Sequence, residues 1–279
     1  LHLLSRRQRQ MCIRDSNNTS IDKYYLGEPA FCVYVEAYGQ KILFDTGYSD
    51  VFLQNAKKAG IDLSQAGYVV LSHGHNDHTG GLKYFKEIVK ESKPFLVACP
   101  EAFKQRYDCD GEFGCPVSKQ EIEKYFTPVY TKESYFISSN IAFLGLIKRQ
   151  NDFEAQSPVG FNKETKEPDF VPDDSALAIN TQKGIVILTG CSHSGIVNIC
   201  QYAQEIFQTH KIHSIIGGLH LINAPKRQLE LTFNYLESLN LETFYPCHCT
   251  GFKAQCMLSS LKPFRECSSG LVINFDFAI

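Results

Sequence analysis

Four residues of the types that bind metal ions stand within six positions of the chain. They are His73, His75, Asp77 and His78, and they follow a short apolar segment at residues 68–71. Neutral imidazole and carboxylate groups are the ligands that first-row divalent metals prefer. Residues two apart at the end of a strand project to the same side, so His73 and His75 can meet one ion. The turn that follows lets Asp77 and His78 face a second ion, and the pattern therefore predicts a two-metal site.

A two-metal site needs further ligands from elsewhere in the chain. Three later histidines each follow a short apolar strand, and they are His193, His220 and His248. The carboxyl ends of sheet strands are where the active sites of α/β proteins gather. We therefore expect these histidines to lie beside the first cluster. The ligand types suit zinc first, with manganese or iron as alternatives.

Two cysteine-containing segments offer alternative chemistry. Cys247-His248-Cys249 is similar to a zinc knuckle, but structural zinc sites use wider cysteine spacing and a second pair. Neighbouring strand residues point to opposite faces, so both cysteines should point away from His248. Cys191 stays open as a nucleophile, because a small residue before a turn can be exposed.

The elements that must position these residues alternate between strands and helices. Residues 31–36 and 41–45 alternate around a turn at Tyr38-Gly39 and predict a hairpin. Residues 151–172 read as a long loop, and such loops often cover active sites. The early hairpin and the later strand–helix units indicate helices that cover stacked sheets. Further strands are predicted at 68–71, 95–98, 141–147, 176–180, 185–188, 214–216, 243–245 and 271–277, and helices at 50–59, 80–90, 196–207 and 229–239.

The composition bounds the class of protein. The 279 residues are 43% hydrophobic and 21% charged, which suits a packed core. The net charge of -2 gives no argument for a nucleic-acid partner, and no apolar run reaches the ~18 residues of a membrane helix. Eleven cysteines, an odd number without a secretory signal, favour a reducing cytoplasm. We expect a small-molecule substrate and no membrane partner, and the oligomeric state stays open.

The first sixteen residues differ from the rest of the chain. They carry four arginines and show neither the apolar core of a signal peptide nor a helical stripe. The segment resembles translated sequencing-adapter read-through, and a basic targeting arm is the alternative. We predict that residues 1–16 are non-native and that residues 17–279 form one domain, with a mixed insertion around residues 100–172.

Several motifs together resemble the metallo-β-lactamase superfamily. They narrow to the branch named for 7,8-dihydropterin-6-yl-methyl-4-(β-D-ribofuranosyl)aminobenzene 5′-phosphate synthase. The resemblance covers the chain from about residue 20 to its end. It rests on FDTG at residues 44–47, LSHGHNDHTGGL at 71–82, DDSAL at 173–177, GCSH at 190–193, GGLH at 217–220 and CHCTG at 247–251.

The resemblance implies an α/β fold, an αββα sandwich with the metals at one edge between the sheets. It implies that Asp45 braces the His73/His75 loop, since a carboxylate behind an imidazole fixes its tautomer. Most superfamily members place a bridging aspartate where this chain has Cys191. The bridging ligand is therefore open.

Two residues could fill the gap at the bridging position. Either His193 enters the site directly, or Asp174 contributes from its loop by supporting the ligands or handling protons. We expect Asp77, His193 and Asp174 to take part in catalysis.

Two reactions and one non-catalytic role fit a metal pair. A metal pair can make hydroxide available at neutral pH, which suits a hydrolase of a phosphoester, lactone or thioester. It can also bind the departing diphosphate of an activated pterin while an arylamine attacks carbon. The third hypothesis is a catalytically silent sensor of metal or ligand. Superfamily membership does not choose among these roles.

An anionic substrate would also need positive or N–H groups. Arg149 follows a predicted strand and precedes the long loop. Thr250 follows His248 at the predicted start of a helix, where backbone N–H groups can bind anions. We expect Arg149 and Thr250 to bind substrate, and the neighbouring Lys148 to be a solvated charge.

Overall fold

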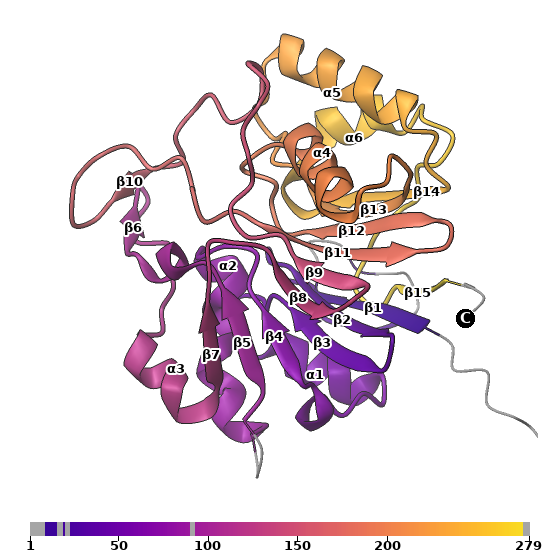
Figure 1. Cartoon of the computed structure of the whole chain (residues 1–279). Coiled ribbons are helices and arrows are strands. Elements are labelled where there is room, and N and C mark those ends of the chain that lie inside the picture. Colours follow the sequence, from indigo (N-terminus) through magenta and orange to yellow (C-terminus); the bar gives the residue numbers. More distant parts are fainter. Residues whose placement is uncertain (1–8, 16–18, 20–22, 90–92, 276–279) are drawn as a thin grey trace, which may run out of the picture.

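A computed structural model describes residues 9–15, 19, 23–89 and 93–275. Its first sheet has the strand order β15-β1-β2-β3-β4-β5-β7 (Figure 1). β2 and β3 form the predicted antiparallel hairpin, and β3, β4, β5 and β7 run parallel. The bounds are β1 Arg9–Asp15, β2 Cys32–Ala37, β3 Gln40–Phe44, β4 Tyr68–Val70, β5 Phe95–Ala98, β7 Thr127–Tyr130 and β15 Val272–Phe275.

The second sheet has the order β14-β13-β12-β11-β9-β8. β11 and β12, at two of the predicted strands, form an antiparallel hairpin, whereas β12, β13 and β14 run parallel. The bounds are β8 Tyr135–Ser138, β9 Ile141–Phe143, β11 Ala176–Thr181, β12 Gly184–Thr189, β13 Ile212–Gly218 and β14 Thr243–Cys247.

Alternation along the strands builds three apolar layers. In β2, Val33 and Val35 belong to the core between the sheets, while Tyr34 faces the outer layer of the first sheet. In β12, Leu188 faces the same inner core and Ile187 faces the outer layer of the second sheet. Because side chains alternate between the two faces of a strand, both faces of each sheet are buried.

Helices cover the two outer faces (Figure 1). On the first sheet these are α1 Val51–Lys58, η2 Gly80–Glu87 and α3 Lys119–Tyr125. On the second they are α4 Ile196–Phe207, α5 Lys226–Ser238 and α6 Phe252–Leu258. The predicted αββα sandwich is confirmed. The remaining short elements are η1 Leu63–Gln65, α2 Asn76–Thr79, η3 Pro100–Phe103, η4 His248–Thr250, and the paired strands β6 Arg106–Tyr107 and β10 Phe161–Asn162.

Two segments differ from expectation. The helix expected at residues 80–90 is the 3-10 segment η2, in which a Cβ on Gly81 would lie 2.1 Å from the carbonyl oxygen of Thr46. The region at residues 100–172 supplies β7 to the first sheet and β8 and β9 to the second. Part of this region therefore belongs to the two sheets of the sandwich, and the remainder forms the loops between these strands.

The N-terminal segment takes part in the first sheet. Arg9–Asp15, which lie in the segment predicted to be non-native, pair as β1 with β2 and β15. That residues 1–16 are non-native stays a prediction. In the described ranges, no helix has both the length and the apolar character to cross a membrane.

Candidate metal centre

The site lies where strands of both sheets end. The parallel strands β3 and β4 end beside one another, as do β12, β13 and β14. Parallel strands carry their carboxyl ends to one edge, so the loops that follow them meet. These loops bring together Asp45, His73, His75, Asp77, His78, Cys191, His193, His220 and His248.

The turn between His73 and His75 is fixed by close packing and a buried cation. A Cβ on Gly74 would lie 1.9 Å from the carbonyl oxygen of Ala102, so a side chain does not fit there. The Gly74 N–H donates to Asp173 Oδ2 at 2.8 Å. Arg106 is fully buried and pairs with Asp173 and, at 2.6 Å, with Asp169. Sequence reasoning missed Arg106, because nothing in its neighbourhood marks it as buried.

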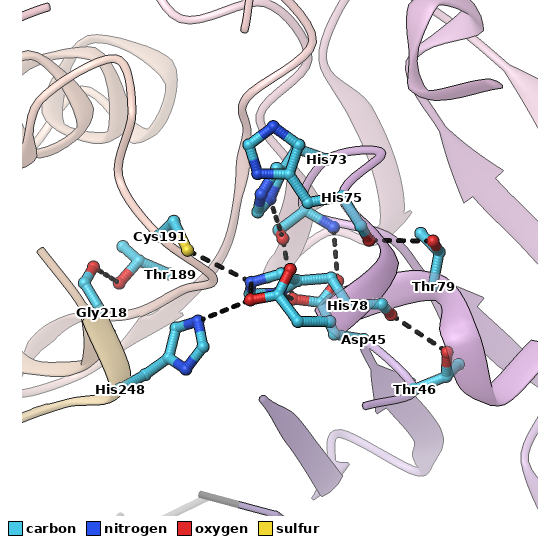
Figure 2. A network of polar contacts seen from close by, with 12 residues as sticks. Asp45, Thr46, His73, His75, His78, Thr79, Thr189, Cys191, Gly218 and His248 are labelled. Carbon is cyan, nitrogen blue, oxygen red and sulfur yellow. Dashed lines mark hydrogen bonds and ion pairs between the residues drawn. The ribbon is translucent and has the colours of Figure 1, made fainter. Parts of the chain in front are cut away.

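Asp45 braces two histidines. Its Oδ2 accepts from His78 Nδ1 at 2.7 Å and from the Ser72 hydroxyl at 2.7 Å, and its Oδ1 accepts from the Ser72 N–H (Figure 2). The Ser72 oxygen lies 2.9 Å from His73 Nδ1. Since the hydroxyl proton is given to Asp45, the oxygen accepts from His73 Nδ1–H. Both rings are then held in the tautomer whose Nε2 can bind a metal. The contacts of Asp45 also include His78, which the predicted brace of the His73/His75 loop did not.

The first group of donors comes from both sheets. Ligand atoms of Asp77, His78, Cys191 and His248 all lie within 4.8 Å of one another. Asp77 Oδ2 is 3.4 Å from His78 Nε2 and 3.2 Å from His248 Nε2. Two donors at ~2.0 to 2.3 Å from one tetrahedral ion lie roughly 3.3 to 3.8 Å apart. The spacing therefore fits donors that share an ion.

The second group consists of His73, Cys191 and His193, again within 4.8 Å. The His75 ring lies beside it, with its centroid 4.4 Å from that of His73 and 4.8 Å from that of His193. Among the described residues, no hydrogen-bond partner is found for Nε2 of His73, Nε2 of His75 or either ring nitrogen of His193. Buried polar atoms are normally paired. These nitrogens are oriented as ligands, and the donor set fits divalent metal ions.

The electrostatics favour the ligand forms of most rings. Burial holds the pKa of His73, His75 and His193 well below the usual value, so these rings are neutral at pH 7. Burial acts the same way on His78, but Asp77 and Asp45 outweigh it and raise its pKa. A cation bound at His78 would thus replace a proton.

His220 lies at the edge of both groups. Its ring centroid is 4.2 Å from that of His193, and its backbone N–H donates to Cys249 Sγ at 3.2 Å. Neither donor group within the described chain includes His220. Its place beside His193 keeps it a candidate ligand of the second group.

The Cys247-His248-Cys249 segment differs from expectation. The strand ends at Cys247, and His248 takes a left-handed conformation with φ 51° at the start of η4. Strand alternation therefore stops before Cys249, whose Sγ lies 3.5 Å from the Cys191 carbonyl oxygen. Cys247 packs in the core between the sheets. Cys249 is thus a neighbour of the site, whereas strand alternation had predicted that it points away from His248.

Asp174 is buried behind His193. Its Oδ2 accepts from the Ser194 N–H at 2.8 Å, and no partner for its Oδ1 occurs in the described structure. Burial raises the pKa of Asp174 to about 6. The geometry keeps open its expected role in supporting ligands or handling a proton.

Arg149 and Thr250 make hydrogen bonds within the protein. Arg149 Nη2 donates to the carbonyls of Phe170 and Val171, at 2.6 and 2.9 Å, so it ties the long loop down. The Thr250 hydroxyl is buried and donates to the Cys247 carbonyl at 2.7 Å. Its side chain is therefore occupied, and the expected binding of substrate by the backbone N–H stays a prediction. Lys148 pairs with Glu205 at the surface, as a solvated charge should.

Two adjoining cavities open at the site. The smaller, of about 300 Å³, is lined by Asp77, His248 and Phe113, whose ring packs edge-on against His75 at 4.9 Å. The larger, of about 480 Å³, is lined by the long loop between β9 and β11 and by the turn after β13. Both share Val159, His193, His220 and Ile222. The expected covering loop thus forms a wall of the larger cavity.

A family model and curated relatives match this chain. Residues 26–93 match the model described as the metallo-beta-lactamase superfamily. A Methanocaldococcus jannaschii protein named 7,8-dihydropterin-6-methyl-4-(beta-D-ribofuranosyl)-aminobenzene-5'-phosphate synthase is 34% identical, over 88% of this chain and 89% of the relative. An uncharacterized protein of the same organism is 31% identical, over 92% and 97%.

Solved structures share the fold. One, described as a metal-dependent hydrolase of the beta-lactamase superfamily, has a TM-score of 0.81 and 31% identity, with 95% of this chain and 98% of that chain covered. Another, described as a diphosphatase from the PhnP family, has a TM-score of 0.56 at 11% identity, with 98% and 99% covered. The second likeness concerns the fold alone.

Proposed function

The chain belongs to the metallo-β-lactamase superfamily, and on that premise we propose that it is an enzyme that holds two divalent metal ions and acts on a small phosphorylated molecule. The observation that carries the proposal is the pair of adjoining donor groups at the mouth of two joined cavities. Asp77, His78 and His248 would hold one ion, and His73, His75 and His193 the other, with His220 beside them. When bound, a metal pair makes a water more acidic and neutralises charge on a leaving group.

The chain's own residues would prepare the site. Asp45 and Ser72 hold the His73 and His78 rings in the tautomers that expose Nε2. Asp174 Oδ1 can take up a proton, since its pKa of about 6 lies near the working pH. Phe113 offers a flat apolar wall beside His75, which suits a planar substrate.

One cation on the larger cavity suits an anionic end of the substrate. Arg227 lines this cavity and is held by both carboxylate oxygens of Asp152 at 2.9 Å. A guanidinium held in place can bind phosphate through two parallel hydrogen bonds. We propose Arg227 as a second substrate-binding arginine, and the role expected for Arg149 stays a prediction. Nothing in the sequence around Arg227, which lies on the helix α5, predicted that it lines a cavity.

Transfer is the first reaction that we propose. In it, the arylamine nitrogen bonds to the pterin methylene carbon, the carbon–oxygen bond to diphosphate breaks, and the amine loses a proton. Similarity to the archaeal synthase supports this reaction, as does the second cavity, which offers room for a second reactant. Hydrolysis of a phosphoester, lactone or thioester is the alternative, supported by the relative described as a metal-dependent hydrolase.

We also propose zinc as the metal and a reducing cytoplasm as the location. The imidazole and carboxylate donors suit zinc, with manganese or iron as alternatives. Among the described residues, nine cysteines from Cys99 to Cys267 are free thiols, which suits a reducing compartment. The net charge of -2 supports a small-molecule substrate over nucleic acid, and we propose no membrane partner.

The test is product analysis with zinc-loaded protein. A hydroxymethyl-dihydropterin diphosphate is offered with and without an arylamine, beside phosphoester, lactone and thioester substrates. Diphosphate release that requires the amine, with an amine adduct seen by mass spectrometry, supports transfer. Release without amine, or turnover of an ester, supports hydrolysis. No turnover of any substrate by protein that holds two ions would support the silent sensor and contradict the proposal.

A further inference from the structure

One sulfur atom belongs to both donor groups. Cys191 is a member of the group with Asp77, His78 and His248 and of the group with His73 and His193. Within the described residues, it is the one member that the two groups share. Its Sγ lies 3.1 Å from His78 Nε2, and Figure 2 shows this contact beside the ring of His248.

We propose that the Cys191 thiolate is a ligand shared by the two metal ions. The inference rests on the proposed two-metal function and adds the ligand that joins the two positions. A thiolate sulfur has several lone pairs and can bind two cations at once, and zinc accepts cysteine sulfur at ~2.3 Å. The bond to each ion uses a sulfur lone pair, and the thiol proton leaves to solvent.

The surroundings of Cys191 favour a ligand over a core thiol. Cys191 is 3% exposed, yet it lies in none of the three apolar clusters formed by the described residues. Cys200 on α4, which is also buried, packs in the apolar layer of the second sheet. The neighbours of Cys191 are instead imidazole rings, a carboxylate and the Cys249 thiol. Within the described residues, His73 and His193 each have a ring nitrogen without a hydrogen-bond partner, and their ligand atoms lie within 4.8 Å of the sulfur.

The backbone around Cys191 is fixed by contacts that leave little freedom. A Cβ on Gly190 would lie 2.1 Å from Ser72 Oγ and 2.9 Å from Asp45 Oδ2, so the loop packs directly against the brace. The Gly190 carbonyl accepts from the Gly218 N–H at 3.0 Å. The sulfur is therefore positioned by the same network that orients His73 and His78.

This position also weakens the reading of Cys191 as a nucleophile. The nucleophile of a covalent mechanism must reach the substrate, and its base must be free to take its proton. His78 Nε2, the nearest base, lies between Cys191 and Asp77, and its other nitrogen is held by Asp45. Cys191 lines the smaller cavity, so the occupied base, and not the reach of the sulfur, argues against a nucleophile.

A shared sulfur changes which metals the site prefers. Soft thiolate ligands favour zinc, cobalt or iron over manganese, whereas a carboxylate at the same place would accept manganese. We therefore expect the wild-type protein to hold zinc or cobalt in competition with manganese. In Cys191→Asp, the preference for zinc or cobalt over manganese should be weaker than in the wild-type protein.

X-ray absorption at the zinc edge tests the inference on the wild-type chain, prepared without oxygen. If both ions share Cys191, each has a sulfur neighbour at ~2.3 Å, and the average is about one sulfur per zinc. A sulfur on one ion alone gives about half that number. Two zinc ions per chain with half a sulfur or none would overturn the shared ligand and leave the two-metal function standing. No bound zinc would overturn both.

Cobalt substitution locates the sulfur. Wild-type protein with cobalt should show a thiolate-to-cobalt charge-transfer band in the near-ultraviolet. Cys191→Ser and Cys191→Asp should lose the band, with the aspartate variant keeping about two ions. Cys249→Ser is the matched control, since Cys249 neighbours Cys191 but lies in neither donor group. Loss of the band in Cys249→Ser with retention in Cys191→Asp would overturn the assignment.

Discussion

The Nδ1 atom of His78 lies 2.7 Å from Oδ2 of Asp45, and both side chains are completely buried. The same oxygen accepts from the Ser72 hydroxyl, and the other oxygen accepts from the Ser72 N–H. Both carboxylate oxygens therefore act only as acceptors. This arrangement fixes which nitrogen of His78 is left to bind a metal, although Asp45 lies behind the donor groups.

Asp45→Asn should lower metal affinity by about 10- to 100-fold. An amide replaces one acceptor oxygen with an N–H donor, which would face either the Ser72 N–H or the His78 Nδ1–H. The measurement is zinc binding in competition with a chromophoric chelator. Glu36→Gln, at a carboxylate that is 40% exposed on β2, is the control and should bind zinc like wild type. Equal affinities in both variants would contradict the bracing role.

Arg106→Leu should destabilise the protein without metal by about 3 to 5 kcal/mol, because it leaves Asp169 and Asp173 buried without their partner. The free energy of unfolding in urea measures this loss. Arg227→Leu, at an exposed ion pair with Asp152, is the control and should cost less than ~1 kcal/mol. Similar losses for the two variants would show that the buried cluster does not hold the His73–His75 turn.

Stability should fall with rising pH through the titration of Glu154. Burial outweighs the hydrogen bonds that Glu154 accepts at the start of α4 and raises its pKa. Its unfolded pKa is about 4.3. In the window between that value and the raised folded value, the native state binds more protons than the unfolded state. The stabilisation is complete below pH ~4.3 and is lost as the pH rises through the folded pKa.

Urea unfolding of wild type and Glu154→Gln at several pH values measures this effect. The difference in unfolding free energy should shift in favour of the glutamine variant as the pH rises. A difference that stays constant across the window, or that shifts the other way, would contradict the raised pKa. The protein without metal is used so that metal binding does not contribute.

Zinc should stabilise the fold. A ligand that binds the native state at 100 times its Kd adds about 2.7 kcal/mol per site. Chelation should therefore lower the melting temperature, and zinc should restore it. His73→Asn should respond much less to zinc, whereas His210→Asn, at an exposed histidine outside the site, should respond like wild type. An equal response in His73→Asn would place the stabilising zinc elsewhere.

Local patterns predicted most of the fold. Alternation at residues 31–36 and 41–45 marked β2 and β3, and the period of residues 196–207 marked α4 with the bounds that the structure gives. The strands β7 and β8 were not predicted, because they are short and mix exposed with partly or fully buried residues. Such strands are defined by their partners in the sheet, and the sequence of one strand carries little of that information.

The candidate site was predicted less completely. The histidines could be predicted from their spacing and from their places after apolar strands. Arg106 could not be found, because its burial depends on two aspartates more than sixty residues away. The positions of Cys249 and Thr250 depend on the turn at His248, whose backbone is in the left-handed conformation. Such non-local or unusual backbone features override simple alternation.

Metal content per chain tests the central claim most directly. Protein purified without oxygen is analysed by elemental mass spectrometry beside His75→Ala, Asp77→Ala and the control His210→Ala. We predict about two ions per chain in wild type and in the control, and fewer in both site variants, because His75 and Asp77 belong to different halves of the site. One ion or none in wild type, unchanged by either substitution, would contradict the two-metal site.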